Sequence, residues 1–121
     1  MRASDSGPTI IDTGSTNIPG LRVIMDEAGN RATVELRNGT KRRMKMNKAL
    51  HEQFLRNLQA AGPLNALPAN HCMKSASFGS SLYVELNGVR SPDLSCPAQV
   101  DPRTKALKSD ATKILRAARN Q

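Results

Sequence analysis

The stretch Leu21–Gly62, LRVIMDEAGNRATVELRNGTKRRMKMNKALHEQFLRNLQAAG, predicts a large part of the fold by itself. As far as Met46, apolar and polar residues alternate, which is typical of strands with one buried face. The turn-forming run 26–30 and the pair Asn38-Gly39 divide this region into three strands, because Asn-Gly favours the tight turn of a hairpin. We expect the inner side chains to be Leu21, Val23, Met25, Ala32, Val34, Leu36, Met44 and Met46.

A helix is expected after the third strand, which we place at Thr40–Met46. Asn47 is a favourable N-cap residue, and Gly62 with Pro63 ends the helix. Between them, apolar residues recur with the spacing of one helical face, at Leu50, Phe54, Leu58 and Ala61, with Leu55 beside them.

A second stretch, Ser77–Arg119, repeats the order of strand, Asn-Gly turn, strand and helix. The turn is Asn87-Gly88, and 72–78 is a possible further strand before it. Asp101 caps the last helix with Pro102 at the first helical position, which is a favoured arrangement. The apolar stripe of this helix is expected at Leu107, Ala111, Ile114, Leu115 and Ala118.

The two ββα-like halves, 21–62 and 72–119, predict an α+β fold in which an antiparallel sheet carries two helices on one face. A chain of 121 residues fits a single domain with its own core, which we place at residues 10–121. The polar residues 1–9 predict a disordered leader. Ile10-Ile11 is short for a strand, and 12–20 reads as a loop because it is rich in turn-forming residues.

The composition favours anionic partners. The net charge is +8, which attracts nucleic acid, anionic lipid or an acidic protein. Basic residues gather near the third strand and on the last helix. An alternative interpretation of those on the helix is that they form the solvated side of an amphipathic helix. The candidate binding residues are Lys41, Arg42, Arg43, Lys45, Arg116 and Arg119, and Lys48, Arg103, Lys105, Lys108 and Lys113 lie near them in the sequence.

The segment 10–15, IIDTGS, resembles the active-site signature of aspartic peptidases. In that family two such aspartates share a proton and activate water, so the resemblance implies a homodimer that uses Asp12 from each chain. Two expected helices, the short chain before Asp12 and the lack of a later hydrophobic-hydrophobic-Gly element argue against it. The alternative is that Asp-Thr-Gly-Ser forms a capped turn before a strand.

No complete catalytic or metal-binding motif is present, which favours a non-enzymatic protein without cofactor or metal. His51, His71, Cys72 and Cys96 are the only imidazole and thiol side chains, and their spacing does not match a zinc site. We expect His51 to be partly buried near the apolar face of its helix. A nucleic-acid-associated protein remains an alternative, although neither a helix-turn-helix nor an RRM signature is found and aromatic residues make up only 2% of the chain.

Cys72 and Cys96 allow one intramolecular disulfide, which we favour over two free thiols. A disulfide implies an oxidising compartment and hence a secreted or periplasmic protein, whereas free thiols would indicate the cytoplasm. The chain has no apolar run of about 18 residues, so no transmembrane helix is expected.

Three segments, DTGSTNIPG (12–20), CMKSASFG (72–79) and SPDLSC (91–96), together resemble a group of uncharacterised, exported bacterial proteins. The resemblance spans Asp12–Cys96 and implies export and a bridge between Cys72 and Cys96. It carries no activity. These observations together favour an exported binding domain of unknown ligand, with the aspartic peptidase and the nucleic-acid-associated protein as alternatives.

Overall fold

The computed structural model describes residues 6–17, 19–26, 31–69, 72, 79–96 and 100–120. The strands are β1 (Ser6–Asp12), β2 (Leu21–Asp26), β3 (Arg31–Leu36), β4 (Lys41–Lys45), β5 (Leu82–Leu86) and β6 (Val89–Arg90). They form one antiparallel sheet in the order β4-β3-β2-β1-β5-β6. The helices are α1 (Lys48–Ala61), the short 3-10 helix η2 (Leu64–Ala66) and α2 (Pro102–Arg119).

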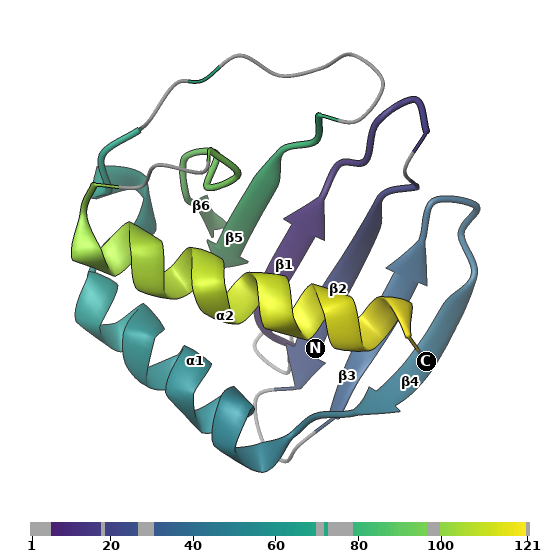
Figure 1. Ribbon diagram of the computed structural model, residues 1–121. Coiled ribbons are helices and arrows are strands. Elements are labelled where there is room, and N and C mark those ends of the chain that lie inside the picture. The colour runs from purple at the N-terminus through teal and green to yellow at the C-terminus, as the bar shows by residue number, and fades with distance from the viewer. Residues whose placement is uncertain are drawn as a thin grey trace.

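The two long helices lie on the same side of the sheet (Figure 1). α2 crosses the strands, with its C-terminal end toward β4, and α1 lies alongside α2. This arrangement confirms the predicted α+β class with two helices on an antiparallel sheet.

The strand β1 was not predicted. It lies in the middle of the sheet, where Ile10 is opposite Val23 of β2 and Val84 of β5. The expectation of a disordered leader up to residue 9 was therefore wrong from Ser6 onward, and residues 1–5 lie outside the described part. The register shifts between Ser6 and Thr9, and residues 8–11 are all buried, so this part of the chain lacks the apolar-polar alternation that marks a strand in the sequence.

Both predicted Asn-Gly turns are present. Asn87 and Gly88 have φ values of 55° and 80°, as the two central residues of a type I′ hairpin turn require. At the other turn Gly39 has a φ of 90°, and Asn38 Oδ1 accepts a hydrogen bond from Thr40 N at 2.9 Å. The local sequence thus determines both hairpins.

The helix caps are also as predicted. Asn47 Oδ1 accepts from Leu50 N at 2.9 Å, and Gly62 ends α1 with a φ of 72°. Asp101 Oδ1 accepts from Arg103 N at 2.8 Å at the start of α2. The side-chain and backbone hydrogen bonds from Arg103 lower the pKa of Asp101 to about 2, so the charged cap persists well into the acid range.

One apolar core joins the sheet and the helices. The predicted inner residues of β2, β3 and β4 are buried, with Leu36 half-buried, and so is the complete apolar stripe of α2. On α1, Phe54, Leu58 and Ala61 are buried, whereas Leu55 is 36% exposed. Within the described residues, neither α1 nor α2 is long and apolar enough to cross a membrane.

The contact between α1 and α2 contains a buried carboxylate that the sequence pattern did not reveal. Asp110 of α2 is 1% exposed. It accepts hydrogen bonds from Gln53 Nε2 at 2.5 Å and from Asn57 Nδ2 at 2.6 Å, both on α1. Because a buried carboxylate is costly without such donors, these two bonds fix how α1 sits against α2.

We predict that Asp110→Ala lowers the free energy of unfolding by about 1–3 kcal/mol, because it removes the two hydrogen bonds that join the buried carboxylate of α2 to α1. Urea unfolding followed by circular dichroism measures the loss. The exposed neighbour change Ser109→Ala is the control and should alter stability by less than about 0.5 kcal/mol. Equal effects of the two changes would show that the carboxylate does not hold the helices together.

Candidate functional site

The basic residues of β4 are divided between the two faces of the sheet. Arg42 is opposite Val34, which is fully buried beneath the helices, whereas Arg43 is opposite Thr33. Since residues directly opposite each other share a face, Arg42 lies on the helix side and Arg43 on the outer side. Lys41 and Lys45 follow Arg43 by the alternation of the strand. The four candidate residues of this strand therefore do not form one patch.

On the outer face, acidic residues accompany these charges. Arg43 Nη2 lies 2.7 Å from Asp26 Oδ2, and its Nη1 donates to Thr33 Oγ1 at 3.1 Å. Lys41 Nζ is 3.8 Å from Glu35, which also lies 3.9 Å from Arg22. Exposed pairs of this kind add little stability, but they reduce the local positive potential.

On the helix side, Arg42 caps the end of α2. Its Nη2 donates to the carbonyl oxygen of Ala118 at 2.7 Å, where the helix dipole favours a cation. Its Nε is buried without a hydrogen-bond partner among the described residues. Sequence reasoning had grouped Arg42 with its strand neighbours and missed this contact, which joins residues 76 positions apart.

Asp12 lies at the end of β1 and binds the last residue of α2. Its Oδ2 accepts from Arg119 Nη2 at 2.7 Å, and its Oδ1 accepts from Gly14 N at 2.9 Å. The second bond closes a turn over Asp-Thr-Gly, which confirms the capped-turn interpretation of this segment. The carboxylate proposed as the alternative catalytic group is thus engaged by its own chain.

Arg119 lines two of the open pockets formed by the described residues. We call the first the apolar pocket. Its volume is about 620 Å³, and it is lined by Pro19, Gly20, Leu21, Leu36, Arg37, Asn38, Arg42 and Arg119. We call the second the serine pocket. Its volume is about 380 Å³, and it is lined by Asp12, Ser80, Leu82, Ser95, Lys108, Thr112, Leu115, Arg116, Arg119 and Asn120.

The two pockets bring together basic residues that are far apart in the sequence. We call Arg37, Arg42, Arg116 and Arg119 the arginine end of the molecule. Three of them were candidates from the sequence, and Arg37 was not, because it follows β3 as one exposed residue of a turn. Arg37 and Arg116 are exposed, and neither forms an ion pair with another described residue.

The segment 91–96 contributes Ser95 to the serine pocket and continues along the edge of the sheet beside β5. In this segment, side chains act as acceptors for two backbone N–H groups of β5. Ser91 Oγ accepts from Val84 N at 3.0 Å, and Asp93 Oδ1 accepts from Leu82 N at 3.0 Å and from Ser95 N at 2.9 Å. This pattern explains why β6 has only two residues.

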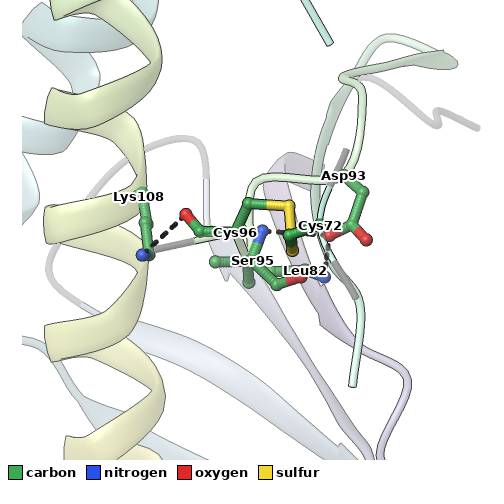
Figure 2. The surroundings of a disulfide bond; sticks show 6 residues. All are labelled: Cys72, Leu82, Asp93, Ser95, Cys96 and Lys108. Carbon is green, nitrogen blue, oxygen red and sulfur yellow. Dashed lines mark hydrogen bonds between the residues drawn. A yellow bond between two sulfur atoms is a disulfide. The ribbon is translucent and has the colours of Figure 1, made fainter. Parts of the chain in front are cut away.

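Cys72 and Cys96 form a disulfide, with their Cα atoms 5.8 Å apart, which confirms the predicted bridge. Figure 2 shows Lys108 reaching from α2 to the carbonyl oxygen of Cys96, to which it donates at 3.0 Å. The disulfide therefore anchors the backbone at Cys96, to which Lys108 of α2 is hydrogen-bonded. The possible strand at 72–78 lies outside the described residues except for Cys72.

In the part of the chain that the structure describes, no group of three His, Cys, Asp or Glu side chains could hold a metal ion. His51 of α1 is 3% exposed, which is deeper than the partial burial expected from its position near the apolar face, and both cysteines are in the disulfide. Comparison with protein-family models, curated proteins and solved structures finds no match to this chain. The site is therefore interpreted from its own geometry.

We predict that Asp12 and Arg119 stabilise the protein as a pair. Asp12→Asn keeps an acceptor for Gly14 N but loses the charge, and Arg119→Gln loses the guanidinium; each should lower the free energy of unfolding by about 1–2 kcal/mol. The double variant should lose little more than either single variant, as a double-mutant cycle from urea unfolding would measure. Fully additive losses would contradict the pairing.

We also predict that removing the disulfide costs about 3 kcal/mol of stability in the chain-entropy model, since it closes a loop of about 25 residues. The measurement compares urea unfolding of the oxidised protein with that of the double variant Cys72→Ser, Cys96→Ser. The double variant should be insensitive to dithiothreitol, which serves as the control. A difference below about 1 kcal/mol would mean that the loop is held by its other contacts.

Proposed function

We propose that this protein is an exported, non-enzymatic binding domain that recognises an acidic protein segment at its arginine end. The observation that supports this most directly is the convergence of Arg37, Arg42 and Arg119 on one open pocket with an apolar floor. These residues come from the turn after β3, from β4 and from the end of α2. The fold thus gathers charge that is dispersed in the sequence.

The local charge at this end differs from that of the outer face. Arg43 and Lys41 have acidic neighbours within 4 Å, whereas Arg37 has none among the described residues. Asp12 is the carboxylate that lines the serine pocket, and it is paired with Arg119. Guanidinium groups bind carboxylates through two parallel hydrogen bonds, so this end is suited to acidic side chains.

The apolar floor favours a peptide over a polyanion. Pro19, Leu21 and Leu36 line the pocket between the arginines, and a segment with both acidic and apolar side chains would bury them. Single-stranded nucleic acid would instead use aromatic side chains for base stacking. Phe54 is fully buried, and Tyr83 lies against Arg90, whose Cζ is 5.0 Å from its ring centre.

Export is supported by the disulfide, because such bonds persist in oxidising compartments. The resemblance of the three short segments to exported bacterial proteins points in the same direction. A binding domain outside the cytoplasm would meet its partner in solution or at the cell surface, where a high net charge accelerates encounter with an acidic surface.

A random peptide library displayed on phage tests this proposal. We expect peptides selected on the oxidised protein to combine Asp or Glu with apolar residues. The double variant Arg37→Glu, Arg116→Glu should bind a selected peptide at least about tenfold more weakly, since reversing close charges costs more than 1.4 kcal/mol. Fluorescence anisotropy at physiological salt gives the affinities.

The matched control is Lys45→Glu, Lys105→Glu, which makes the same change in net charge at two exposed residues that line neither pocket. It should change the affinity by less than about twofold. Equal losses in both double variants would show that net charge alone drives binding. Selection of peptides without acidic residues, or preferential binding of single-stranded DNA, would overturn the proposal.

A further inference from the structure

We infer that the serine pocket is a separate site for a phosphate monoester group carried by a small organic molecule. This goes beyond the acidic segment proposed for the arginine end, because it concerns a second pocket with different walls. Its lining combines side-chain donors with two apolar residues, Leu82 and Leu115. The inference rests on how these donors are placed and on how many of them remain unused.

One wall is a row of donors on α2. Lys108, Thr112 and Arg116 follow one another at intervals of four residues, and residues with this spacing lie one above the other on a helix. Arg119 and Asn120 continue the wall at the C-terminal end. The helix α2 therefore presents three cations and a hydroxyl to the same pocket.

Most of these donors retain capacity for a ligand. Lys108 uses one of its three N–H groups on the Cys96 carbonyl oxygen, at 3.0 Å. That bond fixes the ammonium group at the pocket and leaves two donors. Arg116 is exposed and has no ion-pair partner among the described residues. The guanidinium group of Arg116 is thus available to an anion.

The opposite wall supplies hydroxyl groups. Ser80 precedes β5, and Ser95 belongs to the segment beside it. Ser95 Oγ is buried and has no hydrogen-bond partner among the described residues, while Ser95 N donates to Asp93. A rotation of the Ser95 side chain toward the pocket would give up no hydrogen bond, and an anion there would satisfy a buried hydroxyl that is otherwise costly.

The charge of the lining fits a dianion. Lys108, Arg116 and Arg119 against Asp12 leave a net charge of +2. Asp12 is the group that would repel an anion, but Gly14 N and Arg119 already occupy its two oxygens. A phosphate monoester carries close to two negative charges at neutral pH and has three acceptor oxygens, so it can use donors from both walls.

The size and the apolar residues indicate the rest of the ligand. A volume of about 380 Å³ lies near the lower end of the range for small-molecule sites. Leu82 is 7% exposed and Leu115 is also 7% exposed, so both are parts of the core that reach the pocket floor. They would contact the few carbon atoms that follow the phosphate ester.

NMR titration of the oxidised protein tests this inference. Inorganic phosphate and glycerol 3-phosphate are the probes, with acetate and sodium chloride at matched ionic strength as controls. We expect saturable amide shifts at Ser95, Lys108 and Thr112 with both phosphates, with tighter binding of glycerol 3-phosphate. Acetate and chloride should give weaker shifts that do not saturate. Saturable binding of acetate as tight as that of phosphate would overturn the choice of a phosphate group.

Variants separate this site from the arginine end as a whole. Arg116→Gln should weaken phosphate binding by about tenfold, as loss of a charged hydrogen bond predicts, and Ser95→Ala should weaken it by a smaller factor. Arg37→Glu lies outside the serine pocket and should leave phosphate binding unchanged while it weakens peptide binding. Shifts that do not saturate, or that Arg116→Gln leaves unaltered, would overturn the inference. Because Arg37→Glu affects only the peptide, each proposal can fail without the other.

Discussion

The central strand β1 is the element on which both halves of the molecule depend. It pairs with β2 on one side and with β5 on the other, so the sheet is continuous only through it. Ile10 is fully buried between the two halves. The last residue of β1, Asp12, binds Arg119 near the other end of the chain. A seven-residue strand thus sets the position of both hairpins and of the end of α2.

Three long-range hydrogen bonds fix α2 over the sheet, and in each of them a basic side chain is the donor. Lys108 binds the Cys96 carbonyl oxygen, Arg119 binds Asp12, and the carbonyl oxygen of Ala118 accepts from Arg42. The apolar stripe beneath the helix supplies most of the stabilisation, since burial of apolar area is the largest favourable term. Apolar contacts are not directional, however, and the polar contacts determine which residues face the pockets.

The sequence was sufficient where structure is decided locally. Both Asn-Gly turns, both N-caps and the apolar stripes of the helices follow from neighbouring residues, and all of them were predicted. It was insufficient where partners come from distant segments. Nothing near Asp110 in the sequence shows that Gln53 and Asn57 will cover it, and a carboxylate in a helix is usually exposed.

The candidate binding residues illustrate the same limit. Alternation along β4 places Lys41, Arg43 and Lys45 on one face and Arg42 on the other, and this much follows from the strand pattern. Which face concentrates charge depends on the neighbours across the sheet. Asp26 and Glu35 meet the outer residues, whereas α2 brings Arg119 to the pocket that Arg42 lines. Tertiary packing therefore determines which face of the sheet concentrates positive charge.

The Asp-Thr-Gly-Ser segment shows how a short motif gains a different role from its surroundings. In a peptidase the two aspartates share a proton because like charges close together cannot both ionise. Here Asp12 is paired with a guanidinium 2.7 Å away, and its other oxygen accepts a hydrogen bond from a backbone N–H. A carboxylate held in this way fixes Arg119 between the two pockets. The role of the segment is thus to position Arg119, and the chemistry of the site depends on the surrounding cations.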